Sequence, residues 1–254
     1  MTKMRVTFWG SGDAFGSGGR LQPCLWVESP DCNFLIDCGA TVMPAMRRYH
    51  VNPDAVDVIL ISHLHGDHFG GIPFFILDGQ LISKRTKPLV IAGPVGTAKK
   101  LTLLMETMFP GSATVQRKFP VEILELTPSV RQALPGLQVT PYRVEHMVSD
   151  DSLALRIECC DQIIAYTGDT EWTDALMPAC NAANLVIAEA YYYEKKVKYH
   201  MDLQTLLKHW PEMQAERLVL THMSSEMLLR LGELEGEFAD DGKVIELGRL
   251  EATQ

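Results

Sequence analysis

Short apolar runs alternate with stretches of helical periodicity along the whole chain. Several runs, such as Val56–Ile61, are apolar at nearly every position, which is typical of strands buried on both faces. The pattern predicts a layered α/β fold in which helices cover the sheets, but leaves open whether there is one sheet or two. The predicted strands are Arg5–Trp9, Cys24–Glu28, Asn33–Ile36, Val56–Ile61, Leu89–Ala92, Leu137–Val144, Ser152–Glu158, Gln162–Tyr166, Leu185–Ile187 and Leu218–Leu220, and the predicted helices are Val42–Tyr49, Val95–Met108, Thr173–Ala179 and Leu203–Trp210.

The organisation of the chain favours a single domain over residues 1–254. No internal repeat, low-complexity tract or long Pro/Ser-rich linker divides the sequence. The longest apolar stretches are far shorter than the ~20 residues that a membrane-spanning helix needs, so no membrane partner is expected. The N-terminus has a short strand pattern rather than a basic segment followed by an apolar signal core, which favours a cytoplasmic protein.

Composition narrows the class of protein. Apolar residues make up 46% and charged residues 22% of the chain, which is ordinary for a globular protein. The net charge of -9 argues against a partner held mainly by phosphate neutralisation, because such binding needs clustered Lys and Arg. The six cysteines form no C-x-x-C pair and no regular framework, so we expect buried free thiols. They are Cys24, Cys32, Cys38, Cys159, Cys160 and Cys180.

One segment concentrates side chains that bind metals. Directly after the apolar run Val58–Ile61 come four potential ligands within six residues: His63, His65, Asp67 and His68. A strand delivers its last side chains to one edge of a sheet, and the following turn can fold the others around a common centre. Imidazole and carboxylate suit zinc and neighbouring divalent metals, and one tetrahedral ion rarely takes so many ligands from so short a segment. The segment therefore predicts two metal ions rather than a polar loop of surface histidines.

The spacing His63-x-His65-x-Asp67-His68 resembles the signature of the metallo-β-lactamase superfamily. The resemblance implies a four-layered αβ/βα sandwich with two metal ions at one edge of its sheets. Three further residues match the remaining ligand positions in the family's order, each after a predicted strand. The resemblance then implies that His63, His65 and His146 hold one ion, that Asp67, His68 and His222 hold the other, and that Asp169 bridges the two ions.

Within the superfamily the chain resembles the ribonuclease Z branch of phosphodiesterases. The segments that carry this likeness are Phe8–Ala14, Asp37–Gly39 and Leu218–Ser224. The match implies that Asp37 lies close to the metals and orients a ligand histidine. An ordinary turn aspartate is the alternative that the sequence leaves open.

A further histidine, His200, resembles the branch's non-ligand histidine that donates a proton to the leaving group. A phosphodiester needs such a donor because its alkoxide leaves poorly unless it is protonated. Glu189 resembles the glutamate of the branch's His-Glu-Ala-Thr segment and is expected to steady His200. Ala188 and Tyr191 stand where the family usually has histidine and threonine, so this supporting network departs from the family pattern.

Two features bear on the substrate. Basic and aromatic residues alternate over Tyr191–Lys198, so Lys196 and Lys198 are candidate substrate contacts, with a solvated lysine loop as the alternative. Ribonuclease Z enzymes carry a long basic insertion that grips tRNA between the third histidine and the bridging aspartate, whereas here 22 residues separate His146 from Asp169. We therefore expect a smaller phosphodiester, such as a cyclic nucleotide, a nucleotide-linked ester or a short RNA.

The resulting hypothesis is a hydrolase that uses two divalent ions, zinc or manganese, to activate water. Asp67 is also a candidate to accept a proton from that water. A lactone or thioester hydrolase with the same ligands, and a tRNA 3′-processing endonuclease, are alternatives. A non-enzymatic or di-iron redox protein is disfavoured because redox relatives typically carry glutamate where this chain has His65. The resemblance also implies a homodimer.

Overall fold

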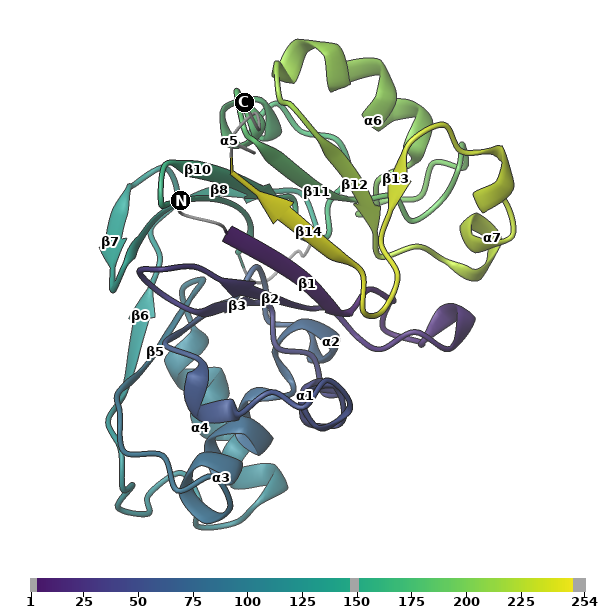
Figure 1. The fold of residues 1–254 in the computed structure, drawn as a ribbon. Helices are drawn as coiled ribbons and strands as arrows, with labels where there is room; N and C mark the ends of the chain where they lie inside the picture. The colour runs from purple at the N-terminus through teal and green to yellow at the C-terminus, as the bar shows by residue number, and fades with distance from the viewer. Residues whose placement is uncertain (1–3, 147–150, 249–254) are drawn as a thin grey trace, which may run out of the picture.

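Two seven-stranded sheets lie face to face in the computed structural model, which describes residues 4–146 and 151–248. Helices cover the outer face of each sheet, so the layers run helix, sheet, sheet, helix (Figure 1). This arrangement confirms the predicted four-layered αβ/βα sandwich and answers the open question of one sheet or two. Within the described part of the chain, no helix is long and apolar enough to cross a membrane.

The first sheet is built from the N-terminal half of the chain and closed by one C-terminal strand. β3 to β6 run parallel to one another, while β1 pairs antiparallel with both of its neighbours. In spatial order its strands are β14 (Val244–Leu247), β1 (Met4–Gly10), β2 (Cys24–Glu28), β3 (Phe34–Ile36), β4 (Val58–Leu60), β5 (Leu89–Gly93) and β6 (Val121–Glu125).

The second sheet follows the same plan with the later strands. β10 to β13 run parallel, and β7 to β10 form an antiparallel meander. In spatial order its strands are β13 (Glu237–Phe238), β12 (Leu218–Thr221), β11 (Leu185–Glu189), β10 (Gln162–Tyr166), β9 (Ser152–Cys159), β8 (Leu137–Val144) and β7 (Gln132–Leu134).

The helices divide between the two outer faces. α1, α3 and α4 pack on the first sheet, and α5 and α6 pack on the second. The α-helices are α1 (Val42–Arg48), α2 (Gly66–Phe69), α3 (Ile72–Leu81), α4 (Thr97–Met108), α5 (Leu176–Cys180), α6 (Leu203–His209) and α7 (Ser225–Leu228), and short 3-10 helices lie at Ser17–Gly19, Pro53–Ala55, Trp210–Met213 and Leu231–Glu233.

Alternation along β4 explains why its sequence is apolar throughout. Val58 and Leu60 enter the core between the two sheets. Ile59 and Ile61 point the other way and pack under the helices of the first sheet. Because successive side chains of a strand leave on opposite faces, a strand between two apolar layers needs apolar residues at every position.

Several elements differ from the sequence prediction. β4 is shorter than the predicted strand Val56–Ile61, and α4 begins at Thr97 instead of Val95. α5 covers Leu176–Cys180 rather than Thr173–Ala179. α3 was not predicted, because an apolar run of this length has no periodicity that separates a buried helix from a strand. The short edge strands β7, β13 and β14 and the partly exposed β6 were also missed, since they lack an extended apolar run.

The cysteines behave largely as expected. All six are free thiols, and only Cys160 is half-buried rather than buried. Cys160 and Asp161 form the turn between β9 and β10, with φ of 50° and 59°. Two successive residues in the left-handed region are typical of a tight hairpin turn.

Replacing Leu60 by Ala is expected to lower the free energy of unfolding by ~2–5 kcal/mol, because Leu60 is fully buried between the sheets. The matched control is Leu103→Ala on α4, where the side chain is 65% exposed and the change should stay within ~0.5 kcal/mol. Urea unfolding followed by circular dichroism measures both. Equal losses for the two variants would contradict the assigned core.

Candidate metal centre

Parallel strands of both sheets bring polar side chains to one seam of the molecule. β3 and β4 are neighbours in the first sheet, and β10, β11 and β12 are neighbours in the second. Side chains that follow the carboxyl ends of parallel strands gather at one edge of a sheet, which is where α/β proteins bind ligands. Asp37 follows β3, His63 follows β4, His146 follows β8, Asp169 follows β10, Glu189 ends β11 and His222 follows β12.

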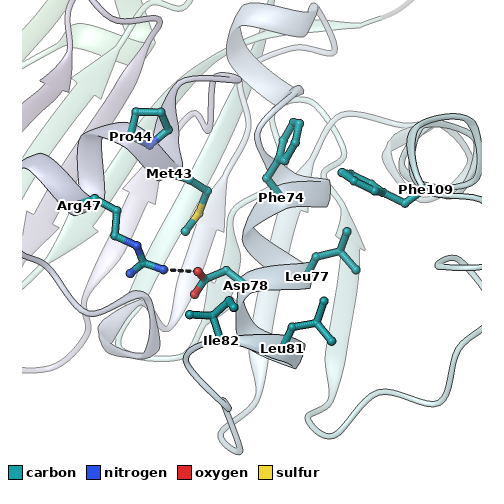
Figure 2. A pocket seen from close by; sticks show the side chains of 9 residues that line it. All are labelled: Met43, Pro44, Arg47, Phe74, Leu77, Asp78, Leu81, Ile82 and Phe109. Carbon is teal, nitrogen blue, oxygen red and sulfur yellow. Dashed lines mark hydrogen bonds and ion pairs between the residues drawn. The ribbon is translucent and has the colours of Figure 1, made fainter.

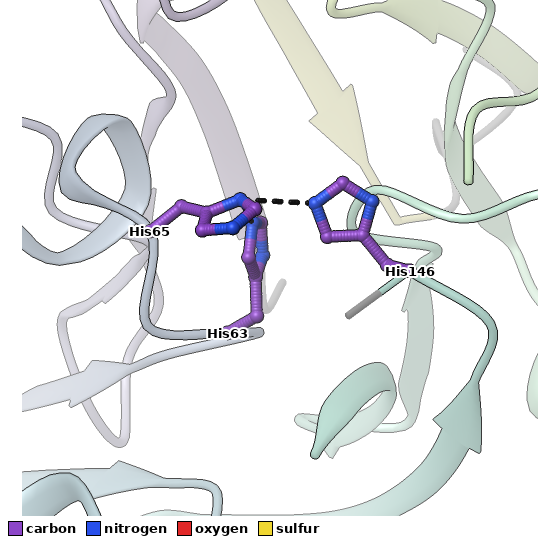
Figure 3. A group of neighbouring side chains, drawn as sticks. All are labelled: His63, His65 and His146. Carbon is purple, nitrogen blue, oxygen red and sulfur yellow. Dashed lines mark hydrogen bonds between the residues drawn. The ribbon is translucent and has the colours of Figure 1, made fainter. Parts of the chain in front are cut away.

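A first group consists of His63, His65 and His146. Figure 3 shows His63 and His65, from the loop after β4, facing His146 from the other sheet. His65 Nδ1 lies 3.2 Å from His63 Nε2 and 3.0 Å from His146 Nε2. Two nitrogens bound to the same tetrahedral zinc stand about 3.3 Å apart, so these three can hold one ion.

A second group joins Asp67, His68, Asp169 and His222, all of them buried. His68 Nε2 lies 3.3 Å from His222 Nε2 and 3.2 Å from Asp67 Oδ2. Asp169 Oδ1 lies 3.4 Å from His68 Nε2, and its Oδ2 lies 3.3 Å from His222 Nε2. These four side chains can hold a second ion.

Asp169 stands between the two groups. Besides its contacts in the second group, its Oδ2 lies 4.0 Å from His63 Nε2 and 3.9 Å from His146 Nε2. Gly168 makes this placement possible. Its φ is +59°, and an added Cβ would meet Ser62 Cβ at 3.0 Å, so a glycine is favoured before Asp169.

The nitrogens that point away from each group are held by acceptors. His68 Nδ1 donates to Asp37 Oδ2 at 2.6 Å, and His146 Nδ1 donates to the Tyr199 carbonyl at 2.8 Å. Ser62 donates its amide to Asp37 Oδ1 and its hydroxyl to Asp37 Oδ2, both at 2.8 Å. The Ser62 hydroxyl is then free to accept from His63 Nδ1 at 3.0 Å. Each of these histidines therefore keeps the Nε2 lone pair for the cluster.

The electrostatics of the cluster also favour cations. Burial, followed by the charge of His68, keeps the pKa of His63 well below its usual value, so His63 is in the neutral form that metals bind. Burial lowers the pKa of His222, but Asp169 and Asp67 outweigh it and raise that pKa to about 10. The carboxylates thus create a strong preference for positive charge at this point.

Two buried atoms of the cluster have unmet bonding capacity. Among the described residues, neither Asp169 Oδ1 nor His222 Nδ1 has a hydrogen-bond partner. A buried carboxylate oxygen without a partner is costly unless a cation or a donor meets it. Together with the imidazole and carboxylate donor set, this orphaned oxygen fits a divalent metal.

Glu189 and His200 lie beside the two groups and, with Asp169 and His222, form a third set of potential metal ligands. Glu189 is buried and accepts a hydrogen bond from His200 Nδ1, while its Oε2 accepts from the amides of Thr170 at 2.8 Å and Met201 at 3.3 Å. The His200 ring centroid is 5.0 Å from that of His146. Burial lowers the pKa of His200, but the bond to Glu189 outweighs it and raises the pKa above its usual value.

The two lysines predicted to contact substrate are less closely tied to the cluster. Lys198 is exposed, and its Nζ lies 4.5 Å from the ring centroid of Tyr199, whose carbonyl holds His146. Lys196 is exposed as well. Between described residues, no hydrogen bond or ion pair joins Lys196 to the cluster.

A separate cavity lies between α1, α3 and the end of α4, and Figure 2 shows that mostly apolar side chains line it. Its charged residues, Arg47 and Asp78, form an ion pair with each other. The cavity therefore offers no group poised for chemistry, and the candidate chemistry lies at the metal centre.

Two contributors were not found from the sequence. Ser62 links Asp37 to His63. In the sequence it is marked by being a polar residue between the apolar run and the first histidine. The Tyr199 carbonyl holds His146 from 53 residues away. A backbone oxygen carries no sequence signal at all.

The fold and the histidine and aspartate cluster, in which only His65 is exposed, define a metallo-β-lactamase-fold protein. The structure resembles the metallo-β-lactamase fold protein YhfI from Bacillus subtilis, with a TM-score of 0.78, 23% identity, and coverage of 96% of this chain and 99% of that one. It also resembles the short form of human tRNase Z (ELAC1), with a TM-score of 0.78, 24% identity, and coverage of 95% and 98%.

Sequence comparison assigns the family. The model described as "Anti-Pycsar protein Apyc1" matches residues 4–243, and the chain belongs to this family. The chain is also 24% identical to the ribonuclease Z of Methanosarcina acetivorans over 290 aligned positions, which cover 96% of this chain and 94% of that protein. It spans less than half the length of other ribonuclease Z relatives that it matches at 32% to 34% identity. The predicted likeness to the ribonuclease Z branch is confirmed.

Replacing Asp37 by Asn is expected to weaken zinc binding roughly 10–100-fold, because the carboxylate that orients His68 and Ser62 is lost. Asn tolerates the φ of 59° at this position, so the backbone should be kept. Competition with a chromophoric chelator measures the affinity.

The matched control is Asp161→Asn, at an exposed turn residue with the same φ of 59°. This variant should bind zinc like the unmodified chain. An equal loss in both variants, or none in Asp37→Asn, would refute the role assigned to Asp37.

Proposed function

We propose that this protein is a dinuclear metal-dependent phosphodiesterase that acts on a small phosphodiester, such as a cyclic nucleotide or a short RNA. The observation that carries the proposal is the placement of His200. It lies outside the two groups that we propose as ligand sets, and its Nδ1, which would be its route into the third set, is already bonded to Glu189. Its ring lies next to that of His146. A thioester hydrolase needs no such acid, because a thiolate leaves without being protonated.

The proposed roles follow the two groups. Three histidines would hold the first ion, two histidines and an aspartate would hold the second, and a shared aspartate would contribute to both. Asp37 and Glu189 orient ligand and acid histidines. The proposed ligands are His63, His65 and His146 for the first ion, Asp67, His68 and His222 for the second, and Asp169 for both.

Divalent ions at this site, which we propose to be zinc with manganese as a substitute, supply the Lewis acidity that activates water and neutralises charge on the phosphoryl oxygens. The chain's own residues handle the protons. His200, with Nδ1 bonded to Glu189, presents Nε2 as the donor to the departing alkoxide. Asp67, whose Oδ2 lies between His68 and His222, is proposed to accept a proton from the attacking water as well as to bind metal.

The size of the substrate is inferred from the segment between His146 and Asp169. Its described part is occupied by β9 and β10, a simple hairpin within the second sheet. The described residues of this segment include no long basic arm, which supports a small substrate over tRNA. The family model that matches this chain describes an anti-Pycsar protein. We propose that this chain has the same anti-Pycsar role.

His200→Ala is expected to lower kcat on a 3′,5′-cyclic nucleotide about 10²–10⁴-fold, because the proton donor to the ribose alkoxide is removed. Zinc content should not change, since His200 lies outside both proposed ligand groups. Steady-state kinetics of zinc-loaded protein and elemental analysis give the two readouts.

The matched control is His50→Ala, at an exposed histidine in the turn after α1, which should leave both readouts unchanged. Chromogenic carboxylic ester and lactone substrates are assayed in parallel. Turnover of these substrates with no phosphodiester turnover, or full activity in His200→Ala, would overturn the proposal.

A further inference from the structure

The aromatic ring of Tyr191 covers one face of His200. The two ring centroids are 4.6 Å apart and the planes are inclined by 27°, which is a stacked arrangement. Tyr191 comes two residues after Glu189, so one short stretch of chain reaches His200 twice. Glu189 holds the edge of the imidazole at Nδ1, and Tyr191 holds its face.

The far end of Tyr191 is anchored in the glycine-rich loop after β1. Its hydroxyl donates to Asp13 Oδ2 at 3.5 Å. Asp13 is only 1% exposed and is itself fixed, because it accepts from the amides of Phe15 at 3.1 Å and Ser17 at 2.9 Å, and from the Ser17 hydroxyl at 2.7 Å. This carboxylate belongs to neither metal group, and its contacts are directed at the loop and at Tyr191.

The backbone of Tyr191 is fixed as well. Its amide donates to the carbonyl of Met201, the residue after His200, at 2.9 Å, and its carbonyl accepts from the amide of Ser224 at 3.1 Å. The ring therefore has a defined place relative to both His200 and the segment that carries His222. Its centroid is 5.9 Å from that of His222.

We propose that Tyr191, anchored by Asp13, is a positioning residue for His200 and keeps the acid's Nε2 aimed at the leaving group. This inference rests on the proposed function. A single hydrogen bond at Nδ1 lets an imidazole tilt about that bond, whereas a ring packed on its face removes the tilt.

The test compares leaving groups. A ribose alkoxide needs protonation as it leaves, whereas 4-nitrophenolate is stable without it, so loss of a positioned acid affects the first far more than the second. Tyr191→Ala should lower kcat on a 3′,5′-cyclic nucleotide roughly tenfold, with KM within about twofold. Its kcat on methyl 4-nitrophenyl phosphate should stay within about twofold. Tyr191→Phe keeps the ring but loses the bond to Asp13, so its kcat should lie between that of Tyr191→Ala and that of the unmodified chain.

Two further variants separate positioning from a general structural effect. Tyr191→Leu retains apolar volume but has no flat ring to stack on His200, so it should behave like Tyr191→Ala. Agreement of the two variants separates loss of the ring from a folding defect caused by the small Ala side chain. Tyr193→Ala is the matched control, because Tyr193 packs against Arg230 instead of His200 and its loss should leave kcat on both substrates unchanged. Metal content is measured for each variant.

The double variant Tyr191→Ala/His200→Ala decides the claim. A residue that acts only through His200 adds no loss once His200 is gone, so the double variant should match His200→Ala alone. Additive losses, equal losses on both substrates, or wild-type kcat in Tyr191→Ala and Tyr191→Leu would overturn the positioning role. A His200→Ala variant with unchanged cyclic-nucleotide turnover would instead overturn the proposed function itself.

Discussion

The buried carboxylate of Asp37 sets the geometry on which the rest of the site depends. Its two oxygens accept from the Ser62 amide, the Ser62 hydroxyl and His68 Nδ1. Because the Ser62 hydroxyl donates its hydrogen bond to Asp37, it can only accept from His63 Nδ1. One carboxylate thereby fixes the tautomer of a histidine in each group, and both Nε2 atoms are left for a metal.

The fold explains why these groups meet. In each sheet the parallel strands end at the same seam. Apolar side chains on both faces of strands such as β4 hold the sheets in place. The turns that follow the strands are short and constrained, with φ of 59° at Asp37 and 54° at His222. Two of the residues that must converge on the cluster thus have backbone in a sparsely populated conformation, as is common at functional sites.

The sequence predicted features formed by residues that are close together along the chain, and it missed contacts between residues that are far apart in the sequence. The strands were found because burial on two faces leaves an unbroken apolar run, and four of the cluster residues were found because they fall within six positions. The bond from Tyr191 to Asp13 spans 178 residues, and Tyr191 was read only as part of an aromatic and basic segment. α3 was missed because hydrophobic residues occur on nearly all of its sides, and the outer ones line the cavity between α1 and α4.

The most direct test is the zinc stoichiometry of metal-stripped protein after equilibration with zinc and removal of excess, measured by elemental analysis per chain. Two histidine groups with a shared aspartate predict two zinc ions per chain. Binding of one ion or none at saturating zinc would contradict the dinuclear centre.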